Sequence, residues 1–189
     1  MSMRTLPLII LAASVSGMVP EASAGSFTAG LDYGWAKARK YCDNITNCSD
    51  SDRGVKAEAG YEFNDNIGVE LGYTSFGTIF DSKDNQFSAS QKSSAVTLSV
   101  LGVMPLSDMF NIYGRAGMAH YKTDSSGSVQ GVPVKDENGN SLLVGAGVNL
   151  LLNEAWSLRA EYQVYANIAR ADGRKDDVHG VYAGFVYRM

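Results

Sequence analysis

The stretch VKAEAGYEFNDNIGVELGYT, residues 55–74, alternates apolar and polar side chains on both sides of a short polar turn. Apolar residues at every second position of each half lie on one face of a β-strand. Asn64, Asp65 and Asn66, between the halves, tolerate left-handed backbone conformations and hydrogen-bond to their own backbone. The stretch therefore predicts a β-hairpin with one apolar and one polar face.

The same alternation continues along the chain from Phe27. Further strands are expected at residues 27–35, 96–100, 110–121, 142–150, 156–164 and 180–189. The connections alternate in length: long polar segments include 77–92, 122–138 and 166–176, and short turns lie at 64–66, 105–108 and 153–154. Bacterial outer-membrane barrels alternate in this way, with short periplasmic turns and long outer loops. We therefore expect an all-β fold, an eight-stranded antiparallel up-and-down transmembrane β-barrel.

The polar face of these strands distinguishes a membrane barrel from a soluble one. It carries glycine in nearly every strand, and glycines facing water would weaken the strands without purpose. Inside a narrow barrel, the same glycines make room for charged side chains that can pair. Aromatic residues lie mostly near strand ends on the opposite face, where interfacial girdles belong. The charges expected in the lumen are Asp32, Lys56, Glu58, Glu62, Glu70, Arg115, Arg159, Glu161 and Arg188.

The N-terminus predicts export. Arg4 precedes an apolar run at residues 6–19, and Ala22-Ser23-Ala24 offers the small-x-small pattern of a signal peptidase site. The run is shorter than a membrane-spanning helix. We expect a signal peptide at residues 1–24 and one outer-membrane barrel domain at residues 25–189. The formal net charge of -4, with scattered Lys and Arg, argues against a nucleic-acid partner.

Two cysteines, Cys42 and Cys48, lie in one polar segment. In an exported protein, a pair this close in sequence most simply forms one disulfide that closes a loop. The segment lacks the further Cys or His residues of a structural zinc site, and its spacing is not that of a two-residue redox motif. We therefore predict a Cys42–Cys48 disulfide.

Residues 98–122 (LSVLGVMPLSDMFNIYGRAGMAHYK) and 156–163 (WSLRAEYQ) resemble the transmembrane domain of the OmpA family. The closing segment is similar to the terminal signature of such barrels, with Phe185, Tyr187 and Met189 at the alternating positions and Met189 in place of a terminal Phe. The resemblance covers the mature chain and implies a barrel without the periplasmic peptidoglycan-binding domain. It also implies recognition by the barrel-assembly machinery. By the same resemblance, Arg115 and Glu161 are lumen charges that can pair to form a plug.

The histidines and the carboxylates of the chain each have a catalytic or metal-binding interpretation and a structural one. Small barrels that deacylate lipid A use a His with a Ser two residues later, but Lys122 and Val181 stand at those positions after His120 and His179. Glu58, Glu62 and Glu70 share one face and could act as acid and base or as metal ligands. Buried carboxylates more simply pair with the lumen Lys and Arg residues. We expect no catalytic residues, no cofactor and no metal.

The expected function is that of a non-enzymatic protein of the bacterial outer membrane with a charge-plugged lumen. It would support envelope integrity and present its outer loops for adhesion, recognition or host interaction. Its expected partners are outer-membrane lipid and lipopolysaccharide, the assembly machinery, and a host or surface ligand. The alternatives are a small pore or ligand-carrying barrel and a lipid-modifying outer-membrane enzyme.

Overall fold

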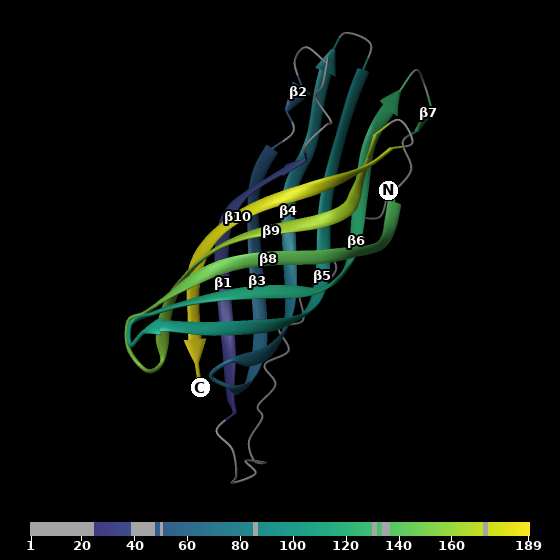
Figure 1. The fold of residues 1–189 in the computed structure, drawn as a ribbon. Coiled ribbons are helices and arrows are strands. Elements are labelled where there is room, and N and C mark those ends of the chain that lie inside the picture. The colour runs from purple at the N-terminus through teal and green to yellow at the C-terminus, as the bar shows by residue number, and fades with distance from the viewer. Residues whose placement is uncertain are drawn as a thin grey trace, which may run out of the picture.

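The computed structural model describes residues 25–38, 48–49, 51–84, 87–129, 132–133, 137–171 and 174–189. Among these residues, no helix has the length and hydropathy needed to span a bilayer. The expected signal peptide at residues 1–24 lies outside the described residues. The long strands of Figure 1 are β1 (Ser26–Ala38), β3 (Ser51–Asn64), β4 (Ile67–Asp84), β5 (Phe87–Ser107), β6 (Phe110–Val129), β8 (Glu137–Leu151), β9 (Trp156–Ala171) and β10 (Arg174–Arg188).

These eight strands form one closed antiparallel barrel, as the sequence predicts. Each pairs with its neighbours along the chain, and β1 pairs with β10 from Thr28 opposite Arg188 to Ala38 opposite Val178. Two short strands pair with the long ones: β2 (Cys48–Ser49) pairs with β4, and β7 (Val132–Pro133) pairs with β6. Because the sheet is closed, every strand within the bilayer pairs its backbone N–H and C=O groups with a neighbour on both sides. A membrane-spanning sheet requires this pairing, since lipid offers no hydrogen bonds.

Around Lys56, the barrel is polar inside and apolar outside. Along β3, Lys56 is 1% exposed while its neighbour Val55 is 53% exposed. The same alternation places Leu31, Leu71 and Leu98 outside, each more than half exposed. Burial of charges beside exposed aliphatic side chains is the reverse of a soluble barrel, so the outer surface is suited to lipid.

The short connections are held by asparagine side chains. Asn64 Oδ1 accepts hydrogen bonds from the backbone N–H groups of Asn66 and Ile67, both at 2.9 Å. Asn153 Oδ1 accepts from Ala155 N at 2.9 Å and Trp156 N at 2.8 Å. These side chains give the turn backbone the partners that the strand ladder no longer supplies.

The strands are longer than the sequence pattern predicts. The expected loop at residues 77–92 is mostly a continuation of β4 and β5, which have 18 and 21 residues. The expected loops at 122–138 and 166–176 are likewise shortened by β6, β8, β9 and β10. A bilayer requires only about 9–11 residues per strand, so the hairpins extend beyond it. In Figure 1, the paired ends of β4 and β5 stand at the top of the picture, beyond β10.

Candidate functional site

Charged side chains from five strands converge in the barrel interior. They are Asp32 on β1, Lys56 and Glu58 on β3, Glu70 on β4, Arg115 on β6, and Arg159 and Glu161 on β9, all at most 8% exposed. Each of them is at an inward-facing position of the side-chain alternation along its strand. We call these seven residues the interior charge network.

Lys56 stands at one side of the network and contacts three carboxylates. Its Nζ lies 3.0 Å from Asp32 Oδ2 and 2.9 Å from Glu58 Oε2, and it also donates to Glu161 Oε1. Asp32 and Lys56 are directly opposite each other on β1 and β3. The ammonium group therefore lies between carboxylates from three strands.

Arg115 and Arg159 link the remaining carboxylates. Arg115 Nη2 lies 2.6 Å from Glu70 Oε2 and 3.1 Å from Glu161 Oε2, and its Nη1 lies 3.3 Å from Glu58 Oε2. Arg159 Nη1 contacts Glu58 Oε1 and lies 2.9 Å from Glu70 Oε1. Each guanidinium thus bridges at least two acids, as charges removed from water require.

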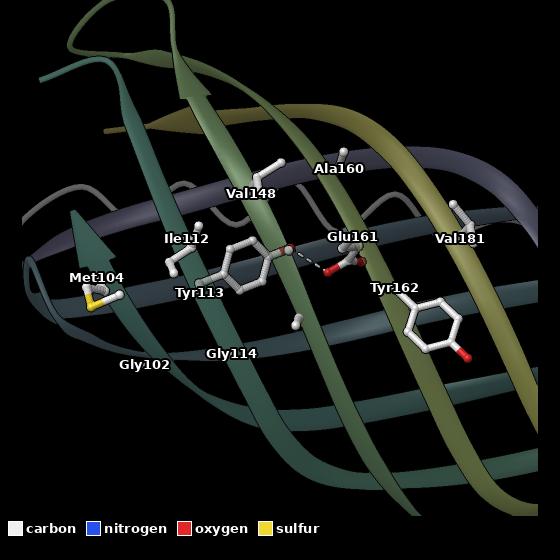
Figure 2. A pocket seen from close by; sticks show the side chains of 12 residues that line it. Gly102, Met104, Ile112, Tyr113, Gly114, Val148, Ala160, Glu161, Tyr162 and Val181 are labelled. Carbon is white, nitrogen blue, oxygen red and sulfur yellow. Dashed lines mark hydrogen bonds between the residues drawn. The ribbon is translucent and has the colours of Figure 1, made fainter. Parts of the chain in front are cut away.

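Neutral side chains complete the network around Glu161. Tyr113 OH on β6 donates to Glu161 Oε2 at 2.6 Å, and Figure 2 shows this bond crossing from β6 to β9. Gln163 Nε2 donates to Glu161 Oε1 at 2.9 Å. The Arg159 guanidinium lies 4.9 Å from the centre of the Tyr113 ring, within cation–π range. Glu161 therefore has partners for both carboxylate oxygens.

Glycines beside the charges provide the space that the side chains occupy. A Cβ at Gly60 would lie 2.6 Å from Thr28 Oγ1, 2.8 Å from Glu70 Cγ and 3.0 Å from the Val69 carbonyl oxygen. Gly60 is directly opposite Glu70 in the β3–β4 ladder. Because these contacts leave no room for a methyl group, glycine is needed at this inward position.

The outer surface of the barrel is hollowed near Tyr113. A hollow of about 710 Å³ lies there, and its lining includes Gly102, Gly114 and Ala146 of β5, β6 and β8. Figure 2 looks into this hollow, with Met104 and Val181 on its two sides. A Cβ at Gly102 would meet nothing within 4 Å, so this outward glycine is not required by packing.

The acids of the network are grouped closely enough to suggest a cation site. One oxygen from each of Asp32, Glu58 and Glu161 lies within 4.8 Å of the others. Lys56 Nζ already contacts all three carboxylates, so its ammonium takes the central position. The sequence offered Glu58, Glu62 and Glu70 as possible metal ligands. Among the described residues, Glu62 and Glu70 belong to no group of three acids close enough to share one ion.

Glu62 and Arg188 form a pair apart from the network. Arg188 Nη2 lies 2.7 Å from Glu62 Oε2, and the two side chains are 39% and 24% exposed. Ser26 Oγ also donates to Glu62 Oε2, at 3.2 Å. The nine charges predicted for the lumen thus divide into seven that converge in the interior and two near the end with the short turns.

An apolar layer fills the interior on the side of the long hairpins. Phe76 and Tyr165 are fully buried with ring centres 4.8 Å apart, and Leu143 and Val178 are also 0% exposed. Tyr165 OH donates to Gln163 Oε1 at 2.5 Å, which joins the layer to the charge network. The interior is therefore polar in the middle of the barrel and apolar toward the long hairpins.

The comparisons with known proteins agree with this architecture. The family model for the OmpA-like transmembrane domain matches residues 22–189. The chain belongs to that family. Outer membrane protein A of Klebsiella aerogenes is 29% identical over an aligned length of 193 residues, and the alignment covers 96% of this chain and 54% of the relative. Outer membrane protein A of Salmonella typhi is 27% identical over an aligned length of 191 residues, and the alignment again covers 96% of this chain and 54% of the relative.

This OmpA-like chain spans about half the length of those relatives, and it is a protein of the bacterial outer membrane. Solved barrels share its fold. Neisserial surface protein A has a TM-score of 0.67 and 18% identity, covering 88% of this chain and 100% of that chain. Ail of Yersinia pestis, in complex with the heparin analogue sucrose octasulfate, has a TM-score of 0.55 and 22% identity, covering 87% and 97%.

Other residues singled out by the sequence lie elsewhere in this OmpA-like barrel. His120 Nδ1 is 2.9 Å from Asn140 Oδ1, and His179 Nδ1 contacts Tyr162 OH. Cys48 lies in β2, whereas Cys42 is outside the described residues, so the disulfide falls outside them too. The terminal residues Phe185, Tyr187 and Met189 face outward and are 54%, 37% and 66% exposed.

The sequence pattern places Tyr113 and Gln163 on the inward face, with Arg115 and Glu161, but it did not identify them as hydrogen-bond partners of Glu161. It also missed the apolar layer. Phe76 lies between the predicted hairpin, which ends at residue 74, and the polar segment expected from residue 77, so the sequence pattern assigns it to no strand. Its burial depends on Tyr165, which is far away in the sequence.

Proposed function

We propose that this protein is a non-enzymatic outer-membrane barrel whose lumen is closed by the interior charge network and the apolar layer above it. The observation that carries the proposal is the bridging of four carboxylates by Lys56, Arg115 and Arg159, all buried. Breaking one buried pair typically costs about 3–5 kcal/mol. A passing solute would have to break several pairs and displace the apolar layer. In this proposal, the barrel is a structural protein embedded in the outer membrane, and it supports the envelope.

Solute uptake by liposomes tests this function. Proteoliposomes containing the folded barrel are expected to resist swelling in small sugars and amino acids as protein-free liposomes do. A trimeric general porin reconstituted in the same lipid serves as the positive control. Rapid swelling with this protein would support the small pore instead of the closed barrel.

The second part of the proposal assigns recognition to the long hairpins. The β4–β5 and β6–β8 hairpins extend beyond the length that a bilayer needs, so they reach outside the membrane. Ail, a relative in fold, was solved with a heparin analogue. A sulfated polysaccharide on a host surface is therefore the first ligand class to test for adhesion.

Cell binding tests the assignment to the hairpins. Bacteria displaying the full protein are expected to adhere to heparin-coated surfaces more than bacteria displaying a variant that lacks residues 79–90. Surface expression of both proteins is measured by antibody as the control. Equal adherence would remove this role from the β4–β5 hairpin.

The lipid-modifying enzyme remains a separate alternative with its own readout. We expect the mass spectrum of lipid A from cells expressing the protein to match that of cells carrying the empty vector. Loss of an acyl chain, or addition of one, would contradict the non-enzymatic assignment.

The proposal also includes processing and assembly. We propose cleavage of residues 1–24, a Cys42–Cys48 disulfide, and recognition of Phe185, Tyr187 and Met189 by the barrel-assembly machinery. Lipopolysaccharide and outer-membrane lipid are the proposed partners of the outer wall. Mass spectrometry of the membrane-extracted protein, with and without reductant, tests the first two: a mature chain beginning at Gly25 and two mass units lighter before reduction is expected.

A further inference from the structure

A cavity of about 250 Å³ opens at one end of the barrel. This is the end that carries the short turns and the C-terminus in Figure 1. The lining of the cavity includes Asp65 from the β3–β4 turn and Asp108 from the β5–β6 turn, with Asn111 and Asn149 deeper inside. A smaller adjoining recess is lined by Asn111, Asn149 and Glu154 of the β8–β9 turn. We call these two spaces together the mouth cavity. In outer-membrane barrels, the end with the short turns faces the periplasm.

The mouth cavity has a negative rim. Asp65, Asp108 and Glu154 are exposed, one on each of the three short turns. Among the described residues, no cation forms an ion pair with any of them. The two arginines of the lining are already occupied, since Arg188 pairs with Glu62 and Arg159 with Glu58 and Glu70. A cleft lined by one sign of charge concentrates counterions of the opposite sign.

These rim carboxylates are not needed to hold the turns. In the β3–β4 and β8–β9 turns, the backbone N–H groups bond to Asn64 and Asn153. In the β5–β6 turn, Met109 N donates to Ser107 Oγ at 3.4 Å. The acids are therefore free to bind a ligand.

Below the rim, Asn111 supplies an acceptor without a partner. Its side chain is 8% exposed, and its Oδ1 receives no hydrogen bond from the described residues. A buried carbonyl oxygen left unpaired costs free energy, so a donor reaching it from the cavity would be stabilising. Asn149 Oδ1, beside it, already accepts from Arg159 Nε at 3.1 Å.

The spacing of the carboxylates favours an extended cation over a metal ion. Among the described residues, the group of three acids that could share one ion is Asp32, Glu58 and Glu161 in the interior, and the rim acids form no such group. An ammonium group has three donors and no acceptor, which suits both the carboxylates and Asn111. Leu101, Val103 and Leu151 add apolar lining that methylene groups can contact.

We propose that the mouth cavity binds a linear aliphatic polyamine from the periplasm, with one ammonium group at Asn111 Oδ1 and the others at the rim carboxylates. This inference does not depend on adhesion by the hairpins, because it uses the opposite end of the barrel. It does not require the lumen to be closed to solutes either. Binding would hold the three turns together and stabilise the folded barrel by mass action.

Calorimetric titration of spermidine into the detergent-folded barrel tests the proposal. Saturable one-site binding is expected, tighter for spermidine than for putrescine, and weakened about tenfold or more in a variant combining Asp65→Asn, Asp108→Asn and Glu154→Gln. Asn111→Leu should weaken binding about threefold or more, because it removes the acceptor. Asp124→Asn, at the opposite end and paired with Lys122 at 2.8 Å, is the control and should bind as the unaltered protein does.

Heat-modifiable gel migration shows in each case that the variant is folded. The proposal is overturned if spermidine does not saturate, if the triple variant binds as tightly as the unaltered protein, or if Asn111→Leu has no effect. Displacement of spermidine by Mg²⁺ at equal ionic strength would also overturn it, since that result indicates a diffuse counterion layer and not a built site.

Discussion

Arg115 on β6 and Glu161 on β9 meet inside the barrel, with Nη2 and Oε2 3.1 Å apart. Removing either one leaves an uncompensated buried charge and is expected to cost about 3–5 kcal/mol of unfolding free energy. Arg115→Ala combined with Glu161→Ala should cost clearly less than the two single changes together. Urea unfolding of the four proteins in detergent measures this coupling, and strict additivity would show that the two charges are independent.

Gly60 and Gly102 make a matched pair of glycines on opposite faces of the wall. Gly60→Ala forces a methyl group against Thr28, Glu70 and the Val69 carbonyl, and it is expected to cost about 1–3 kcal/mol of stability. Gly102→Ala points into open space and is expected to change stability by about 0.5 kcal/mol or less. Equal losses in the urea midpoint would contradict the assignment of Gly60 to a crowded interior.

At the scale of the element, the β3–β4 turn depends on Asn64 and not on Asp65. Asn64→Ala removes the acceptor of two backbone N–H groups and is expected to destabilise the barrel by about 1–2 kcal/mol. Asp65→Ala, in the same turn, is the control and should leave stability nearly unchanged. The opposite order in urea unfolding would mean that the carboxylate holds the turn.

The long hairpins give a second prediction for the elements. Backbone pairing between β4 and β5 continues from Thr78 opposite Lys92 to Asp84 opposite Phe87, after register shifts near Gly77. Amides in residues 81–84 are therefore expected to exchange hydrogen more slowly than an unstructured peptide, though faster than those at 69–73 within the bilayer. Mass spectrometry of hydrogen exchange in detergent measures this. Unprotected exchange at 81–84 would contradict the strand extension and support the loop predicted from the sequence.

The alternation of side chains was enough to predict the strands, their inward faces and the closed barrel. Lys56, Glu58 and Glu161 could be assigned to the lumen because parity alone decides the direction of a side chain in a strand. The strand extensions could not be predicted, because both faces of a hairpin outside the membrane meet water and the alternation disappears. Specific partners such as Phe76 with Tyr165 also could not, since they depend on the register between distant strands.

At the scale of the whole molecule, the exposed aliphatic side chains of the barrel's outer surface require lipid or detergent around them. Because every backbone group in the bilayer pairs within the closed sheet, the folded chain should survive in detergent until it is heated. An unboiled sample is expected to migrate differently from a boiled one on a denaturing gel. A folded monomer that stays soluble without detergent would contradict the membrane barrel.

The closed lumen is the central claim, and the current across a planar bilayer containing the purified barrel tests it most directly. Ions are smaller than the solutes of a swelling assay, so they detect any continuous water path past Lys56, Arg115 and Arg159. The charge network and the apolar layer at Phe76 and Leu143 predict a current indistinguishable from that of the protein-free bilayer, interrupted at most by brief openings. Steady, large, long-lived channels would contradict the account.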